Sequence, residues 1–92
     1  MDFAPERAVT RQEMAVILLS YAIYKGYEMP EHRDMLNYSD MGRIAEEAVT
    51  AVNAVTQAGV MSGYSNRFSP ARSATRAEVA QLFKNFVRFV VD

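Results

Sequence analysis

The sequence predicts an all-α fold, a small helical bundle of three main helices joined by turn-rich connections. Apolar residues recur every three or four positions in three separate stretches, as they do along the buried face of a helix. No stretch sustains the alternation of apolar and polar residues that is typical of a half-buried strand. Half of the 92 residues are apolar, which is enough for the packed core of one small domain.

The first helix is predicted to begin after Thr10 and to end at about Lys25. Gly26 then provides the left-handed residue that commonly follows a helix. An irregular linker at residues 27–37, which contains Pro30, comes next. The buried face of this helix is expected to carry Met14, Ile17, Leu18, Tyr21 and Ala22.

The second helix is predicted over Ile44–Ala58 and is closed by Gly59, with Asp40 or Ser39 capping a short turn before it. Its expected buried face consists of Ile44, Ala48, Ala51, Val52 and Val55. The third helix is predicted to begin at Thr75 and to continue to about Val90. Its expected buried face consists of Val79, Leu82, Phe83, Phe86, Val87 and Val90.

The chain contains an internal repeat. A shift of 65 residues places residues 3–15 over residues 68–80, and seven of the thirteen positions are identical, in the pattern Phe-x-Pro-x-Arg-x-x-Thr-Arg-x-Glu-x-Ala. Self-similarity at such a period indicates a supersecondary unit that is used more than once. We therefore expect residues 1–26 to be the second half of one repeat, residues 27–37 a linker and residues 38–92 a complete repeat.

Both copies of the repeat begin a helix with Thr-Arg-x-Glu, at residues 10–13 and 75–78. Threonine as N-cap and glutamate three residues later form a capping box, so these two residues have a structural explanation. The arginine has no such structural explanation, because a cation at the first helical position is mildly unfavourable beside the positive end of the helix dipole. An arginine at an exposed helix N-terminus suits carboxylate binding, which makes Arg11 and Arg76 candidates for ligand contact. A salt bridge to a neighbouring helix is the alternative.

Further motifs precede the second Thr-Arg-x-Glu in a fixed order: Tyr38-Ser-Asp40, an alanine-rich helix, Gly59-Val-Met-Ser-Gly63-Tyr64 and Phe68-Ser-Pro70. This order and spacing resemble those of S-layer homology repeats, and the resemblance extends from Phe3 to about Val87. It implies a helical bundle of S-layer homology type, typically with three repeats around a pseudo-threefold axis.

The resemblance also implies a function. Such modules are non-catalytic anchors that hold exported proteins on the cell wall of mostly Gram-positive bacteria, at an extracellular, cell-surface location. Their usual ligand is a secondary cell-wall polysaccharide with pyruvate ketals, bound non-covalently in grooves between neighbouring repeats of the same chain. By position in the motifs, the implied ligand-binding residues are Arg76, Arg11, Asp40, Gly59 and Gly63.

Glu47 departs from the family pattern. Counted back from Gly59, it occupies the position where the family most often has tryptophan, so a surface for stacking on a sugar is lost and a negative charge is added. Gln12 likewise replaces the usual alanine of the first motif. Either this groove binds weakly, with avidity over several grooves compensating, or its ligand differs. The alternative function is a structural or protein-interaction helical repeat that has lost glycan binding.

Composition argues against other classes of function. Lys+Arg 10 against Asp+Glu 11 leaves no basic excess for binding nucleic acid. With no cysteine and with His32 as the one histidine, neither a metal site nor a cofactor is expected. No Ser, His or Cys arrangement with catalytic spacing suggests an enzyme. The longest apolar run, Met14–Leu19, is too short for membrane insertion, and no signal peptide is visible.

A half repeat normally packs against neighbouring repeats. We therefore expect the first or the third helix to expose apolar surface. A homodimer, or an arrangement in which two chains exchange a helix, is predicted to cover that surface.

Overall fold

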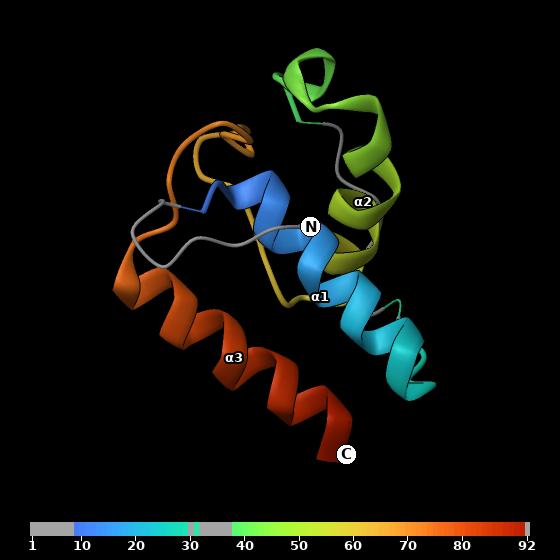
Figure 1. The fold of residues 1–92 in the computed structure, drawn as a ribbon. Helices are drawn as coiled ribbons and strands as arrows, with labels where there is room; N and C mark the ends of the chain where they lie inside the picture. Colours follow the sequence, from blue (N-terminus) through green and yellow to red (C-terminus); the bar gives the residue numbers. More distant parts are fainter. Residues whose placement is uncertain (1–8, 30, 32–37, 92) are drawn as a thin grey trace.

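The computed structural model describes residues 9–29, 31 and 38–91, without the side chains of residues 89–91, and shows a helical bundle (Figure 1). Its α-helices are α1 (Arg11–Lys25), α2 (Val49–Gln57) and α3 (Arg76–Val91). Two short 3₁₀ helices, η1 (Met41–Arg43) and η2 (Glu46–Ala48), precede α2. The described part of the chain contains no strand, which confirms the all-α fold class. Most of the predicted linker at residues 27–37 lies outside the described residues.

The structure confirms the predicted ends of α1. The Thr10 side chain accepts a hydrogen bond from the Glu13 backbone N–H, and the Glu13 carboxylate accepts one from the Thr10 backbone N–H, which completes the capping box. At the other end Gly26 has a φ of 76°, and its backbone N–H donates to the last turn of the helix.

The predicted start of the second helix was wrong by five residues. Ile44 and Ala45 have extended backbone, and the α-helix begins only at Val49. The extended step at Ile44 sends its side chain into the core, where it is buried. It also leaves the Ala45 N–H free to donate to the Gln12 side chain of α1, at 2.9 Å. This hydrogen bond from Ala45 to Gln12 therefore links the segment that precedes α2 to α1.

The core lies between α1, α2 and the segment that follows α2. The residues predicted to face inward on the second helix are all buried, although Ile44 and Ala48 precede α2. On α1 Met14, Leu18 and Ala22 are buried, Ile17 is intermediate and Tyr21 is about half exposed. Phe68 is fully buried, with its ring 5.4 Å from the ring of Tyr38. The Tyr38 hydroxyl is hydrogen-bonded to the Thr56 hydroxyl inside the core, so this buried polar pair is satisfied.

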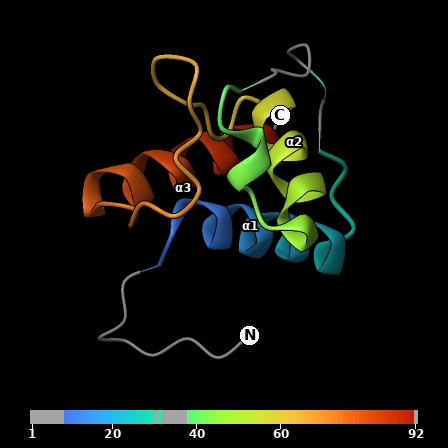
Figure 2. The same ribbon diagram turned by 90° about the horizontal axis from the view of Figure 1, so that it is seen from above.

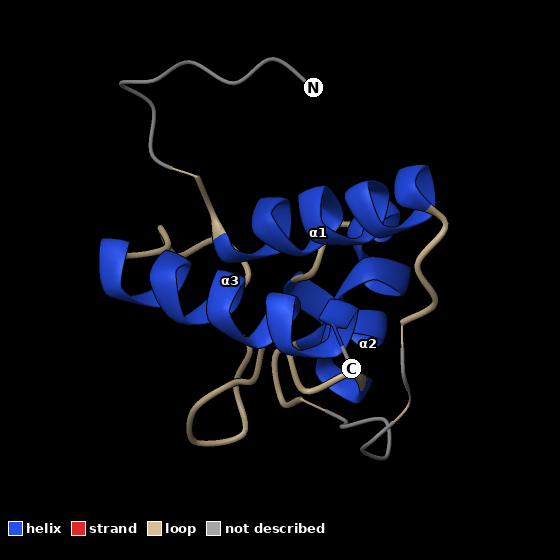
Figure 3. Cartoon of the chain, turned by 90° about the horizontal axis from the view of Figure 1, so that it is seen from below, coloured by secondary structure: helices blue, strands red, loops and turns tan. Residues whose placement is uncertain are grey.

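Helix α3 is buried along a narrower face than the sequence predicts. Figures 2 and 3 show it beside α1, and the Phe86 ring lies 5.9 Å from the ring of Tyr21. Leu82 and Phe86 are buried as predicted, but Phe83 and Val87 are 50% and 53% exposed. The expectation that the first or third helix exposes apolar surface is thus confirmed, because α1 and α3 expose large apolar residues at Tyr21, Ile23, Tyr24, Phe83 and Val87.

Candidate functional site

A tight loop between α2 and α3 forms the framework of the candidate site. Tyr64 and Arg67 exchange two backbone hydrogen bonds, at 2.9 and 3.0 Å, and Ser65 and Asn66 between them both have positive φ, as in a type I′ turn. Gly63 has no room for a side chain, because a Cβ there would lie 2.2 Å from the Arg67 carbonyl oxygen and 2.7 Å from Tyr38. The loop therefore needs glycine at this position.

The carboxylate of Asp40 holds the second half of this loop in place. Its two oxygens accept the backbone N–H groups of Phe68, at 2.9 Å, and Ser69, at 2.8 Å, and Ser69 itself has a positive φ of 58°. Partial burial acts to raise the pKa of Asp40. The backbone hydrogen bonds, together with the positive charge of Arg67, outweigh this effect and place the pKa below its ordinary value. Asp40 is thus ionised and fixes the loop, and it does not cap η1.

Arg11 is buried beneath the loop, and each of its three guanidinium nitrogens donates a hydrogen bond within the protein. Its side chain is 7% exposed. Nε donates to the Phe68 carbonyl at 2.7 Å, Nη2 donates to the Ser62 carbonyl at 2.8 Å, and Nη1 pairs with the Glu78 carboxylate. The guanidinium also lies over the Phe68 ring, 4.8 Å from its centroid. Arg11 therefore joins the start of α1, both ends of the loop and the start of α3.

Glu78 is the carboxylate at which these elements meet. It completes a second capping box with Thr75, as the sequence predicts, and it also accepts two hydrogen bonds from Arg72 at 2.9 and 3.0 Å. Partial burial acts to raise its pKa, but the Thr75 backbone N–H, Arg72 and Arg11 together lower the pKa to about 2. Glu78 therefore stays ionised at neutral pH.

Two adjoining hollows flank the loop, and we call them together the loop groove. One, of about 950 Å³, lies on the Asp40 side, and the other, of about 620 Å³, lies on the Glu78 side; Arg67, Ser69 and Arg72 line both. Small-molecule sites are typically about 300–1,000 Å³ in volume, so each hollow is large enough for a small ligand. The full lining comprises Arg11, Ser39, Asp40, Gly42, Arg43, Ser62, Gly63, Tyr64, Ser65, Arg67, Phe68, Ser69, Pro70, Ala71, Arg72 and Glu78.

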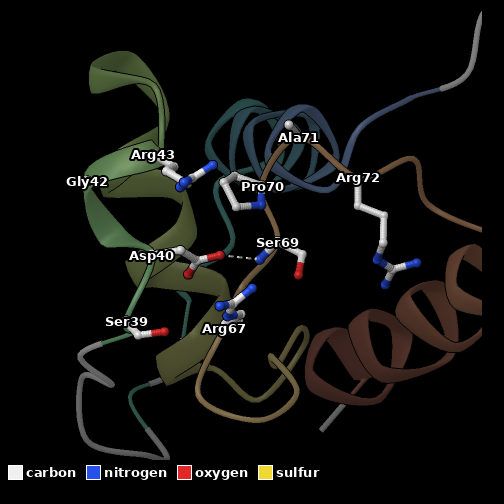
Figure 4. Close-up of a pocket in the computed structure, with 9 residues that line it drawn as sticks. All are labelled: Ser39, Asp40, Gly42, Arg43, Arg67, Ser69, Pro70, Ala71 and Arg72. Atoms are coloured by element: carbon white, nitrogen blue, oxygen red, sulfur yellow. Dashed lines mark hydrogen bonds between the residues drawn. The ribbon is translucent and has the colours of Figure 1, made fainter.

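The loop groove is positively charged although the chain has a net charge of −1. Its lining contains four arginines and two carboxylates. The Asp40 carboxylate already accepts hydrogen bonds from the loop backbone, and the Glu78 carboxylate accepts them from Arg11 and Arg72. Figure 4 shows the side chains of Arg43 and Arg67 on either side of Asp40, with Arg72 farther along the same hollow. Among the described residues, neither Arg43 nor Arg67 forms an ion pair within 4.0 Å. The groove therefore presents exposed guanidinium groups to an anion.

The structure brings together three of the six residues that the sequence marks for ligand binding. Arg11, Asp40 and Gly63 line the loop groove. Arg76, Gly59 and Glu47 line neither hollow.

These three residues have other surroundings. Arg76 is exposed on the first turn of α3, and Glu47 is exposed on η2, so the negative charge that Glu47 adds falls outside the groove. Gly59 has a φ of 76° directly after the end of α2, a conformation that disfavours other residues and gives this glycine a structural role.

Sequence reasoning missed the groove residues Arg43, Arg67, Arg72 and Tyr64. Arg43 and Arg67 lie between the recognised motifs, whereas Arg72 is the first arginine of the repeated pattern and Tyr64 ends the glycine-containing motif; neither of these two residues was marked for ligand contact. Arg67 could have been noticed as the residue directly before the Phe68-Ser-Pro70 motif. Tyr64 is 87% exposed on the rim of the groove and provides an aromatic face there.

Two further findings concern the described residues only. No group of three or more His, Cys, Asp and Glu side chains in that part of the chain is arranged to hold a metal ion. None of the helices described combines the length and apolar character needed to cross a membrane.

Comparison with known protein families gives a match between residues 37–80 and the family model described as S-layer homology domain. No curated protein and no solved structure matches the chain. The matched residues include every residue that lines the loop groove except Arg11, which the preceding copy of the Thr-Arg-x-Glu motif provides.

Proposed function

We propose that this chain, whose residues 37–80 match the S-layer homology domain family, is a cell-wall anchor that binds an acidic wall polysaccharide in the loop groove. Domains of this family are generally non-catalytic modules that anchor proteins at the cell wall. The proposed ligand is a secondary cell-wall polysaccharide with pyruvate ketals, each of which carries a carboxylate. The proposed location is the outer surface of a Gram-positive bacterium.

The observation that carries this proposal is the excess of arginine in the loop groove. Guanidinium groups bind carboxylates by paired, charge-assisted hydrogen bonds, and an exposed carboxylate on a sugar ring is such a partner. Arg43 and Arg67 have no ion-pair partner within 4.0 Å among the described residues, so binding an anion would break no ion pair of that part of the chain. Arg72 is 52% exposed while it pairs with Glu78, which leaves part of its guanidinium accessible.

The remaining groove residues support the ligand in different ways. Asp40 and Gly63 shape the loop, and Arg11 fixes that loop to α1 and α3 from below. Tyr64 offers an exposed aromatic face at the rim, on which a sugar ring can pack in place of the missing tryptophan. We therefore assign direct contact to Arg43, Arg67, Arg72 and Tyr64, and a positioning role to Arg11, Asp40 and Gly63.

The test is cosedimentation of the chain with purified cell walls that carry the pyruvylated polysaccharide. The double variant Arg43→Gln/Arg67→Gln removes two charges from the groove, and it should sediment much less than the wild type. Arg88→Gln removes a charge from an exposed position of α3 that does not line the groove, so it should sediment like the wild type. Equal sedimentation of the double variant and the wild type would refute the proposed site.

A second candidate function is a structural or protein-interaction repeat without glycan binding. The observation that favours it is the apolar surface exposed on α1 and α3, which suits contact with protein more than with sugar. Absence of the wild-type chain from the cell-wall pellet, at a concentration where it is folded by circular dichroism, would favour this second function.

A further inference from the structure

The larger hollow of the loop groove lies between two stretches of chain. We call residues 39–45 the first wall and residues 66–72 the second wall. Arg43 extends from the first wall, and Arg67 and Arg72 extend from the second. Figure 4 shows Arg43 on one side of this hollow and Arg72 on the other. An acidic group that is bound from both walls at once requires a fixed separation between them, because charge-assisted hydrogen bonds form at about 2.7–2.9 Å.

The two walls are joined where the first wall begins. The Asp40 carboxylate accepts two backbone N–H groups of the second wall, at 2.8 and 2.9 Å. The Ser39 backbone N–H donates to the Asn66 carbonyl oxygen at 2.7 Å. These bonds fix the start of the first wall, but Arg43 lies three residues beyond Asp40. The position of Arg43 therefore depends also on how the far end of the first wall is held.

Gln12 joins the two walls at that far end. Its side-chain Oε1 accepts the backbone N–H of Ala45, two residues after Arg43, at 2.9 Å. Its own backbone N–H donates to the Pro70 carbonyl oxygen of the second wall, at 3.1 Å. Gln12 thus makes one hydrogen bond to each wall. Since only the bond to Ala45 uses the side chain, a substitution of Gln12 removes that bond and leaves the other in place.

The capping motif does not account for this glutamine. The second copy of Thr-Arg-x-Glu has Ala77 at the corresponding position and still forms its capping box. The start of a helix in this repeat therefore does not need an amide side chain there. What Gln12 adds to the first copy is a partly buried hydrogen bond to the first wall.

We propose that Gln12 is a positioning residue that sets the width of the loop groove. Its side chain holds the wall that carries Arg43 at a fixed distance from the second wall, so that guanidinium groups of both walls reach one acidic group. Gln12 acts through Arg43, since Gln12 itself lines neither hollow. The effect on glycan affinity rests on the proposed function, whereas the effect on groove width does not, and the two are measured separately.

The groove width is measured without glycan, as the distance between two spin labels. Because the sequence contains no cysteine, Gly42→Cys and Ala71→Cys place one label on each wall, both at exposed positions. A Cβ at Gly42 meets no atom within 4 Å, so a side chain fits there. Pulsed electron paramagnetic resonance then gives the distribution of distances between the labels.

We expect a narrow distribution with Gln12 in place and a broader one in the Gln12→Ala variant. Gln12→Glu keeps an acceptor for the Ala45 N–H and should restore the narrow distribution. Gln81→Ala is the matched control, since it removes a glutamine that donates to Asn85 on the exposed side of α3, and it should change nothing. Equal distributions with and without Gln12→Ala would overturn the proposal, and so would a failure of Gln12→Glu to restore the width.

A substitution at the donor end tests the same bond independently. Ala45→Pro removes the backbone N–H, and the backbone suits proline, because φ of Ala45 is −57° and ψ of Ile44 is 131°. This variant should broaden the distribution as Gln12→Ala does. The two substitutions together should broaden it no further, since both remove one and the same bond. Additive broadening would contradict a role of Gln12 through Ala45.

The effect on binding is measured by titrating each variant with the pyruvylated polysaccharide in a calorimeter. The net contribution of one hydrogen bond corresponds to about a fivefold change in affinity, which is the loss expected for Gln12→Ala. Gln81→Ala should bind like the wild type, and circular dichroism should show both variants folded. Equal affinity of Gln12→Ala and the wild type would overturn the role of Gln12. Absence of binding by the wild type would instead refute the proposed function, and the label distances would still decide the role of Gln12.

Discussion

Arg11→Met and Arg76→Met should have very different effects on the stability of the 92-residue chain, although the two arginines occupy equivalent positions of the repeat. Methionine keeps the apolar contact with Phe68 but removes the bonds to the Phe68 and Ser62 carbonyls and to Glu78. Hydrogen bonds from a charged donor are worth about 1.5–3 kcal/mol each, and Glu78 retains Arg72 as a partner. After allowance for water reaching the exposed residue Ser62, we expect Arg11→Met to lower the free energy of unfolding by about 3 kcal/mol.

Arg76→Met should change the free energy of unfolding by no more than about 0.5 kcal/mol, as is usual for an exposed position. The measurement is urea unfolding at pH 7, followed by circular dichroism of the helices. A loss of about 3 kcal/mol is a large part of the total stability expected for a domain of this size, which is on the order of 5–14 kcal/mol. Equal losses in the two variants would refute the structural role given to Arg11.

Three further predictions concern the loop, its pH dependence and the apolar face. Gly63→Ala should strongly destabilise the fold, because its Cβ would overlap the Arg67 carbonyl; a thermal unfolding midpoint equal to that of the wild type would contradict the loop geometry. The folded pKa of Glu78 is about 2, against an ordinary value of 4.5. Its stabilisation should therefore be complete above pH 4.5 and lost as the pH falls towards 2, and acid titration of Glu78→Gln should show a smaller loss over that range. The 92-residue chain should self-associate at high concentration through exposed apolar surface, and light scattering should detect fewer dimers for Phe83→Lys.

The fold could be predicted in outline because its main determinants are local. Hydrophobic spacing located all three helices, and capping chemistry located both ends of α1. The start of α2 could not be predicted this way, since Ile44 is buried from an extended segment and not from a helix. What stabilises that segment is a contact with Gln12, thirty-three residues earlier in the chain, which local patterns do not reveal.

The exposure of α3 could not be predicted from its own periodicity. Its apolar spacing is compatible with burial of Phe83 and Val87 as well as of Leu82 and Phe86. Which of these is buried depends on how many partners the helix has. Within the described chain Leu82 and Phe86 are buried, with Phe86 against Tyr21 of α1, while Phe83 and Val87 are about half exposed.

The candidate site could be predicted only where it coincided with a motif. Asp40 and Gly63 were marked because they match motif positions of the family, and the structure shows that both shape the loop. The interpretation of Arg11 needed the structure, since the predicted alternatives were an exposed ligand contact and a salt bridge. The structure shows the salt bridge, to Glu78, within a buried cluster. Arg43 and Arg67 come together through tertiary folding alone.

The central claim, that the loop groove binds the acidic group of a wall polysaccharide, is tested most directly by titrating the chain with the purified polysaccharide in a calorimeter. Two samples are compared at one salt concentration: the intact polysaccharide, and the same material after mild acid hydrolysis has removed its pyruvate ketals. We predict saturable binding to the intact polysaccharide and loss of that binding after hydrolysis. Equal binding of the two samples, or no binding of the intact one, would contradict the claim.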